Sequence, residues 1–281
     1  MGDCTGKYYS LGNSFNNVPL PPDVQFSSGT WIYEVLRVIN GSCIFLEDHL
    51  NRLNVSLRLA GISFRLGYHE AFPVIQELVR RNGLENGNIR LMVQMAENNT
   101  PIWVMCCIPF SYPQGSDYEF GVSTAIFRAA RENPNIKQYY PLYQKQMADF
   151  ITAKNRFEAL LVDDQDRITE GSKSNVFFIR DQTLFTAPGA SVLKGITRDK
   201  VISMCSELKY KLIEKAVSTA DLSNMDSVFI TGTSPKVLPV CRVDDQSFNV
   251  DHPMMRNIMK VYDRLIESEI SRIRTALQRN L

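Results

Sequence analysis

Three short segments in the second half of the chain carry residues that could bind an anion and support proton transfer. The segment Ile168 to Ser174 reads I-T-E-G-S-K-S and places one carboxylate, Glu170, directly before a glycine. The segments L-K-G-I-T-R at Leu193 to Arg198 and T-G-T-S-P at Thr231 to Pro235 follow it. Each can offer backbone N–H groups and hydroxyls to a phosphate-sized anion, the first at a helix N-terminus and the second beside a glycine. Their order predicts an acid and two anion-binding loops within one half of the chain.

Lys137 precedes these segments and is the candidate nucleophile. A lysine amine loses its proton readily when it is desolvated, so it can bond to a carbonyl carbon and later act as a base, which arginine cannot do. The residue pattern alone leaves the choice of lysine open, because several others lie nearby, namely Lys145, Lys154, Lys173 and Lys194.

Together these segments resemble the pyridoxal-phosphate enzymes of fold type IV, the family of branched-chain and D-amino-acid aminotransferases and aminodeoxychorismate lyase. In that family the reactive lysine lies in a strand-to-helix turn upstream of an E-G-x-x-S-N element, and N-I-K-Q-Y-Y around Lys137 fits that place. The resemblance implies that Lys137 forms a Schiff base with pyridoxal 5'-phosphate. It also implies that Glu170 stabilises the protonated pyridine nitrogen of this cofactor.

The same resemblance suggests the remaining site residues. H-L-N-R-L matches the family's H-x-x-R-L, whose arginine holds the phosphate, and Thr197 is also expected as an ordinary helix N-cap. The implied cofactor-binding residues are Arg52, Glu170, Ser174, Asn175, Ile196, Thr197, Gly232 and Thr233. The implied substrate-binding residues are Tyr33, Arg90 and Ser234.

The substrate class is indicated less uniformly. G-T-W-I-Y-E-V resembles the aminotransferase strand with a substrate-facing aromatic, which places Tyr33 near the substrate, and I-R-L resembles the branched-chain enzymes' I-R-P, which places Arg90 there. Met95 stands about where D-amino-acid enzymes carry a carboxylate-binding arginine, which counts against a D-specific enzyme. The branched-chain enzymes carry N-Y shortly after the lysine, where this chain has Q-Y-Y-P-L-Y. The role of that N-Y element cannot be assigned to Tyr139, Tyr140 or Tyr143.

We therefore expect an aminotransferase that moves an amino group between an amino acid or amine and a 2-oxo acid. The resemblance also implies a homodimer in which each pocket borrows a loop from its partner. One alternative is an aminodeoxychorismate lyase that releases 4-aminobenzoate and pyruvate, although Tyr33 and Glu34 stand where those lyases usually show a threonine-bearing element. The other is a catalytically silent homologue that still binds pyridoxal phosphate.

Composition favours a small-molecule enzyme. The chain has 281 residues, of which 44% are hydrophobic, enough for one large domain or two smaller ones. With 31 basic and 30 acidic residues its net charge is +1, so no strong field would recruit nucleic acid or an anionic membrane. Residue spacing predicts no metal site.

Apolar runs and cysteines bear on the compartment. No run is long enough for a membrane helix and the N-terminus lacks a signal core, so a cytoplasmic protein is expected. The six cysteines are scattered and are expected to be reduced core thiols, with Cys106 and Cys107 on opposite faces of one strand.

The resemblance implies a two-domain α+β fold of type IV, and the elements expected from the sequence agree with it. We expect a small N-terminal α/β sandwich over residues 1–112, a linker over 113–120 and a larger, strand-rich C-terminal pseudo-barrel with helices over 121–281. In the first, Asn40-Gly41 predicts a hairpin and a leucine stripe predicts a helix from Leu46, with a second helix over Glu70 to Arg81. In the second, helices are expected over Leu142 to Phe157, from Thr197 and from Pro253.

Overall fold

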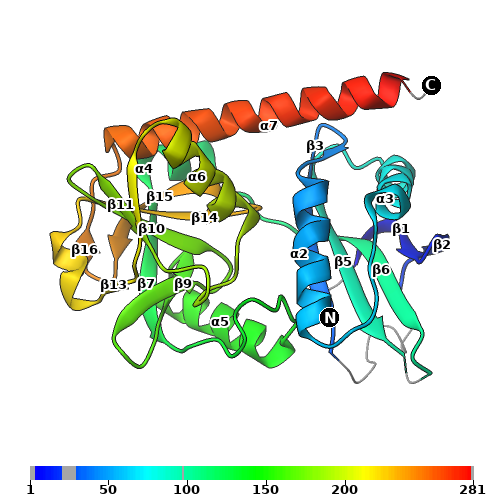
Figure 1. Ribbon diagram of the computed structural model, residues 1–281, viewed down its shortest axis with the longest axis horizontal. Helices are drawn as coiled ribbons and strands as arrows, with labels where there is room; N and C mark the ends of the chain where they lie inside the picture. Colours follow the sequence, from blue (N-terminus) through cyan, green and yellow to red (C-terminus); the bar gives the residue numbers. More distant parts are fainter. Residues whose placement is uncertain (1–3, 21–29, 97, 280–281) are drawn as a thin grey trace. The chain divides into compact units, whose positions relative to one another are not determined.

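The computed structural model describes residues 4–20, 30–96 and 98–279 (Figure 1). The chain forms two compact units by its internal contacts. The first comprises Met1–Ser111, Ile136–Tyr139 and Leu265–Leu281, and the second comprises Tyr112–Asn135 and Tyr140–Arg264. The short stretch that contains Lys137 therefore belongs to the first unit, although both of its neighbours in the chain belong to the second.

The first unit is built on a six-stranded sheet with the order β2-β1-β6-β5-β3-β4. Every neighbouring pair is antiparallel. The strands are β1 (Thr5–Leu11), β2 (Ser14–Asn17), β3 (Ile32–Ile39), β4 (Ser42–Cys43), β5 (Gly87–Met95) and β6 (Pro101–Ile108). The β1–β2 hairpin was not expected from the sequence. The predicted Asn40-Gly41 turn is confirmed, because both residues have positive φ, as a tight hairpin requires.

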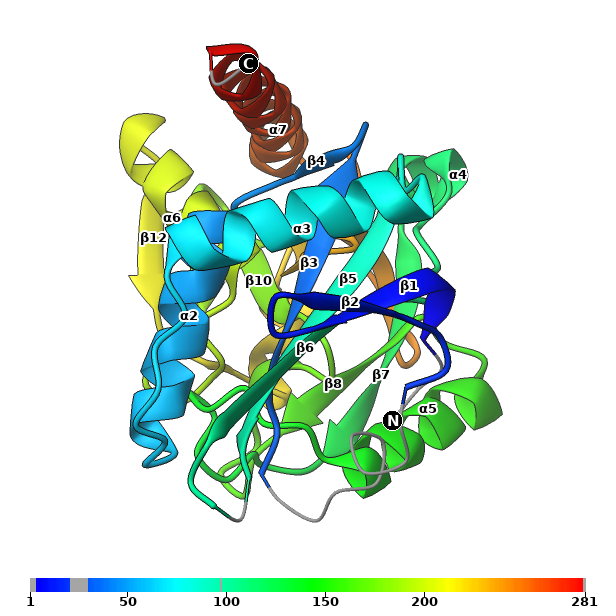
Figure 2. The ribbon, with the colours of Figure 1, turned by 90° about the vertical axis from the view of Figure 1, so that its right-hand side faces the viewer.

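Two helices cover one face of this sheet, α2 (Leu46–Leu59) and α3 (Tyr68–Asn82) (Figure 2). The leucine stripe of α2, Leu46, Leu50, Leu53 and Leu57, is buried in a core shared with α3 and the strands. The opposite face of the sheet carries a smaller cluster around Trp31 and Met92, which includes Tyr33 and Tyr139. The expected arrangement of two helices on one side of the strands is confirmed.

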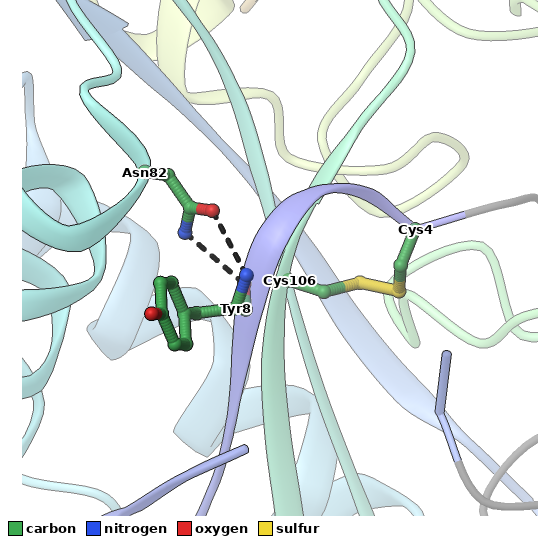
Figure 3. Close-up of a disulfide and its surroundings, with 4 residues drawn as sticks. All are labelled: Cys4, Tyr8, Asn82 and Cys106. Atoms are coloured by element: carbon green, nitrogen blue, oxygen red, sulfur yellow. Dashed lines mark hydrogen bonds between the residues drawn. A yellow bond between two sulfur atoms is a disulfide. The ribbon is translucent and has the colours of Figure 1, made fainter. Parts of the chain in front are cut away.

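The cysteines of the first unit differ from expectation. Cys4 forms a disulfide with Cys106 across the β1 and β6 pair, with their Cα atoms 5.8 Å apart (Figure 3). The prediction of six reduced thiols is wrong for this pair, because only the tertiary pairing of β1 with β6 brings Cys4 within reach. Asn82 ties the same strand to α3 by bonding both the N–H and the carbonyl of Tyr8, each at 3.0 Å. Cys106 and Cys107 do lie on opposite faces, as predicted.

The second unit contains a ten-stranded mixed sheet. Its path is β12-β11-β10-β14-β15-β7-β8-β9-β13, and β16 pairs with β15. The strands are β7 (Val122–Arg128), β8 (Glu158–Val162), β9 (Arg167–Gly171), β10 (Asn175–Arg180), β11 (Thr183–Thr186), β12 (Lys211–Glu214), β13 (Val217–Ser218), β14 (Ser227–Gly232), β15 (Lys236–Val243) and β16 (Gln246–Ser247). The stacked rings of Phe177 and Phe229, 5.0 Å apart, are fully buried on β10 and β14.

Three helices lie close to their expected positions, namely α5 (Pro141–Lys154), α6 (Ile196–Glu207) and α7 (Pro253–Arg279), whose first part belongs to this unit. The helix α4 (Gly115–Phe120) and the short 3-10 helix η1 (Ala220–Asn224) were not predicted. The predicted linker thus contains a short helix. Within residues 4–20, 30–96 and 98–279, no helix has the length and apolar character needed to span a bilayer.

Candidate active site

The three motif segments of the second unit meet at Asn175, the first residue of β10. Asn175 lies opposite Thr231 of β14 in the strand register, at the start of the T-G-T-S-P segment. Its side-chain nitrogen donates to the carbonyl of Leu193 at 2.9 Å, and its side-chain oxygen occupies the space that a Cβ on Gly195 would need. Gly195 is therefore required for this close contact, and Asn175 links the three segments within the second unit.

Glu170 is the next-to-last residue of β9 and is 2% exposed. Its Oε2 accepts a hydrogen bond from the Leu193 N–H at 3.2 Å, and its Oε1 lies 3.3 Å from Nε of Arg131. Arg131 also donates to the Ser172 carbonyl at 2.6 Å. The arginine lies in the loop after β7, where the sequence offered no signal of its role. It supplies a positive charge that compensates for burial of the carboxylate.

The N-terminus of α6 is capped by the backbone of Gly195 without a side-chain hydrogen bond. The prediction of Thr197 as the N-cap is wrong, because Thr197 lies inside the helix and its hydroxyl is 3.1 Å from the hydroxyl of Tyr262 in α7. The first N–H groups of a helix have no partner within it, so this end attracts an anion. Buried Arg198 bonds to the Ala187 carbonyl at 2.9 Å and to Glu214 at 2.6 Å, which anchors this end of the helix.

The end of β14 offers a second set of donors. A Cβ at Gly232 would lie 3.1 Å from the ring of Pro235, so a glycine fits closely here. Thr233 and Ser234 follow in the turn to β15. The Thr231 hydroxyl is buried and has no hydrogen-bond partner among the described residues. Because α6 packs against β14, the two loops belong to one region of the second unit. Polar donors of this type and a helix N-terminus suit a phosphate.

Lys137 lies between β7 and α5, in the strand-to-helix connection that was predicted. Its backbone forms hydrogen bonds with other residues of the first unit. Its carbonyl accepts from the Tyr33 N–H at 3.0 Å, and its N–H donates to the Ser56 hydroxyl of α2 at 3.2 Å. Two residues on, the Tyr139 N–H donates to the Trp31 carbonyl at 2.9 Å. The stretch is thus an added pairing partner at the start of β3. The Lys137 amine sits 4.8 Å from the centre of the Tyr33 ring.

Tyr33, Tyr139 and Arg90 form a continuous row beside this lysine. The two tyrosine rings meet edge to face with centres 5.8 Å apart, and the Arg90 guanidinium lies 5.7 Å from the centre of the Tyr139 ring. Burial lowers the pKa of Arg90 from its ordinary value. No ion pair or hydrogen bond of its guanidinium is found among the described residues, and its Nε is buried. A buried, unpaired guanidinium favours an anionic ligand.

Arg52 forms hydrogen bonds with the carboxylate of Glu34, in the same unit. Its Nε and one terminal nitrogen bond both oxygens of Glu34, at 2.8 and 2.6 Å, and Nδ1 of His49 is 2.7 Å from the same group. Burial alone would raise the pKa of Glu34, but the charge and hydrogen bonds of Arg52, helped by His49, lower it to about 2. Burial lowers the pKa of His49, so it is neutral and acts as an orienting donor.

The structure thus groups the predicted residues in two sets. Lys137, Tyr33, Arg90 and Arg52 belong to the first unit, and the second unit holds Glu170, Ser174, Asn175, Ile196, Thr197, Gly232, Thr233 and Ser234. Ser174 differs from the expectation in that its hydroxyl donates to Glu158, at 3.0 Å. Among the described residues, no cluster of histidine, cysteine or carboxylate side chains could hold a metal ion.

Comparison with known proteins agrees with these features. The model of the family "Amino-transferase class IV" matches residues 31–243. The D-alanine aminotransferase of Bacillus licheniformis is 30% identical over 263 residues, which cover 89% of this chain and 92% of that protein.

Solved structures share the fold. A branched-chain amino acid aminotransferase of Escherichia coli superposes with a TM-score of 0.82 at 21% identity, covering 93% of this chain and 95% of that one. A branched-chain aminotransferase of Thermoproteus uzoniensis, with norvaline, gives 0.80 at 23% identity, with coverage of 94% and 96%. The expected two-domain α+β fold of type IV is confirmed, and the chain belongs to the class IV aminotransferase family.

Proposed function

We propose that this protein is a pyridoxal-phosphate-dependent aminotransferase that moves an amino group between an amino acid and a 2-oxo acid. The observation that carries this proposal is the placement of Lys137, whose backbone is bonded on one side to β3 and on the other to α2, with its amine beside Tyr33. Membership of a family whose curated relatives include D-alanine aminotransferases supports it.

The residues present fit pyridoxal phosphate. Its phosphate suits the donors at the start of α6 and the end of β14, and a buried carboxylate beside Arg131 suits a protonated ring nitrogen. When bound, this cofactor supplies an aldehyde for the amino group and a ring that takes up the electrons left on the substrate carbon.

The reacting groups of the chain then have distinct tasks. The Lys137 amine would hold the cofactor and, with an amino substrate bound, would take up and return a proton at the substrate α-carbon. Tyr33 covers the amine with the face of its ring, 4.8 Å away, which limits access of water. Glu170, which lies beside Arg131, would stabilise positive charge on the ring nitrogen.

Five residues are proposed to bind the phosphate, namely Arg52, Ile196, Thr197, Gly232 and Thr233. Ile196, Thr197, Gly232 and Thr233 offer N–H groups and hydroxyls, and Asn175 keeps the 193–195 segment in place rather than binding the anion itself. Arg52 remains the proposed cationic ligand because of its place in the H-L-N-R-L segment, and Glu34 accepts hydrogen bonds from two of its nitrogens. The buried Glu34 carboxylate fixes the direction in which Arg52 points.

Arg90 is the proposed receptor for a substrate carboxylate, with Tyr33 and Ser234 as further substrate contacts. The guanidinium is largely buried and unpaired among the described residues, so a carboxylate would restore the charge balance that burial has disturbed. The sequence left the role of Tyr139 open. The centre of its ring lies 5.7 Å from the Arg90 guanidinium, and we propose that it holds that side chain in place. An amino acid and a 2-oxo acid both carry the required group.

We propose a homodimer, since Leu142 of α5 is 85% exposed and Tyr140, the residue before this helix, is 45% exposed. We propose a cytoplasmic location on the composition of the chain. Size-exclusion chromatography with light scattering tests the dimer directly.

The test of the activity uses purified wild-type protein and Lys137→Ala. The wild type should turn yellow with pyridoxal phosphate, lose that colour on borohydride treatment, and exchange amino groups between amino acids and 2-oxo acids. Lys137→Ala should fold, bind the cofactor only reversibly and lose amino-group exchange by at least about a thousandfold. Release of 4-aminobenzoate from aminodeoxychorismate, without amino-group exchange, would identify a lyase instead. Colour without turnover of any amino donor would indicate a silent homologue.

A further inference from the structure

Glu158, the first residue of β8, is a buried carboxylate that the sequence did not single out. It is 4% exposed. Its Oε1 accepts from the Ser172 hydroxyl at 2.6 Å and the Ala159 N–H at 2.9 Å, and its Oε2 accepts from the Ser174 hydroxyl at 3.0 Å and the Lys173 N–H at 3.3 Å. Each oxygen therefore receives one hydroxyl and one backbone N–H, and among the described residues the carboxylate has no ion pair.

These contacts hold the segment 171–174 in one conformation. The Gly171 N–H also donates to the Ser174 carbonyl at 2.7 Å, and the Ser172 N–H donates to the Ala159 carbonyl at 2.9 Å. A Cβ on Gly171 would collide with the Ser174 hydroxyl and lie 3.2 Å from the Glu158 side chain. The glycine and the two serines of E-G-S-K-S thus serve the packing of one carboxylate.

The segment 171–174 carries a proposed site residue on each side. Glu170 precedes it and accepts from the Leu193 N–H at 3.2 Å, and Asn175 follows it and donates to the Leu193 carbonyl at 2.9 Å. Arg131, beside Glu170, binds the segment itself through the Ser172 carbonyl at 2.6 Å. A shift of 171–174 would therefore move Glu170, its arginine and its N–H donor together.

We propose that Glu158 is a positioning residue that sets the direction of the Glu170 carboxylate by holding the segment 171–174. This inference rests on the proposed role of Glu170 at the cofactor ring. The four donors on Glu158 are neutral, whereas Arg131 lies against Glu170 and binds the Ser172 carbonyl. We expect the effect of Glu158 on cofactor affinity to act mainly through Glu170.

Glu158→Gln is the sharpest variant because it keeps the shape of the side chain. A carboxamide has one acceptor oxygen and one donor nitrogen, and the nitrogen would face either the Ala159 or the Lys173 N–H. The serine hydroxyls can rotate and accept, but a backbone N–H cannot. One buried donor is left unpaired in either orientation, so the segment must shift. Ser172→Ala is a milder second variant, which removes one donor to Glu158 and leaves the rest in place.

Asp163→Asn is the matched control. Asp163 follows β8 at its other end, where it accepts from the Gln165 and Arg167 N–H groups at 3.0 Å and thereby holds the turn before β9. The substitution makes the same chemical change in the same hairpin, at the turn away from Glu170. General weakening of the hairpin would affect both variants alike.

The experiment measures the affinity of the apoprotein for pyridoxal phosphate by absorbance, together with the melting temperature, for Glu158→Gln, Ser172→Ala, Asp163→Asn, Glu170→Gln and the double variant of Glu158 and Glu170. Glu158→Gln should weaken cofactor binding about tenfold, Ser172→Ala less, and Asp163→Asn by less than about twofold. In the Glu170→Gln background the Glu158 substitution should add less than about twofold.

Wild-type affinity in Glu158→Gln overturns the inference, and so does a loss that simply adds to that of Glu170→Gln. A loss of affinity in Asp163→Asn equal to that in Glu158→Gln does so as well, because it would indicate a purely structural role. Failure of the proposed function is a separate result, since wild-type protein would then show no amino-group exchange whatever the Glu158 variants bind.

Discussion

The Asn175 side chain donates a hydrogen bond to the backbone carbonyl of Leu193 at 2.9 Å, across a separation of 18 residues. The N–H of the same Leu193 donates to Glu170. Leu193 is therefore bonded to both the first and the last residue of the E-G-S-K-S-N segment. The helix α6 starts three residues later, at Ile196. One peptide segment therefore links the proposed ring acid to the proposed phosphate loop.

Asn175→Ala should weaken binding of pyridoxal phosphate more than binding of pyridoxal. Loss of the Leu193 contact frees the 193–195 segment and the N-terminal amides of α6, which only the phosphate uses. We expect a loss of about tenfold for the phosphorylated form. Absorbance titration of the apoprotein with both compounds measures it. Equal losses for the two compounds would show that Asn175 does not act through the phosphate.

Glu34→Gln should destabilise the first unit and remove part of its acid sensitivity. The pKa of Glu34 is lowered from 4.5 to about 2, so its ionised form contributes about 3 kcal/mol to folding above pH 4.5. That contribution is lost as the pH falls from 4.5 towards 2. Buried His49, whose pKa is also lowered, adds a loss in the same direction, because the unfolded chain binds its proton more readily.

Urea unfolding of wild type and variant at neutral and acidic pH checks this prediction. Glu77→Gln is the matched control, since Glu77 also pairs with arginines and its pKa is also lowered to about 2, but it lies on the surface of α3. Solvent screens such pairs, so the control should lose less stability. Equal stability of Glu34→Gln and wild type at neutral pH would contradict the assignment.

Arg90→Lys should raise KM for 2-oxo acids and amino acids about tenfold while changing kcat less. A lysine keeps the charge but cannot bind a carboxylate with two parallel hydrogen bonds. Steady-state kinetics with both substrates varied separates the two constants. Arg180→Lys, at an arginine that lies over the Phe185 ring 5.3 Å away, is the control and should behave as wild type. An unchanged KM in Arg90→Lys would remove Arg90 from the substrate site.

Cys4→Ser should lower stability without changing the fold. The disulfide closes a loop of 102 residues, and loss of a crosslink of this kind costs about 2 to 5 kcal/mol. The β1–β6 pairing and the Asn82 contacts remain to hold the strand. Thermal unfolding with Cys241→Ser as control measures the difference. Thiol titration of the denatured protein should find the free cysteines, Cys43, Cys107, Cys205 and Cys241, before reduction and two more after it. Six reactive thiols before reduction would show that the bond does not form.

The sequence alone determined the local parts of this protein. The leucine stripe of α2, the Asn40-Gly41 turn and the order of the three motif segments depend on spacing of a few residues, and the fold contains all of them. Local periodicity and turn chemistry act over one or two turns of backbone, which is why the pattern is visible in the chain itself.

Tertiary structure decided which distant side chains serve those motifs. Three contacts depend on how strands and helices pack: that of Arg131 with Glu170, that of Glu158 with Ser172, and that of Lys137 with Ser56, 81 residues away. The same holds for Cys4, which finds Cys106 only because β1 adds to β6. Nothing in the local spacing of residues records such contacts, because each arises when a buried polar group or thiol meets whichever partner the packed fold brings to it.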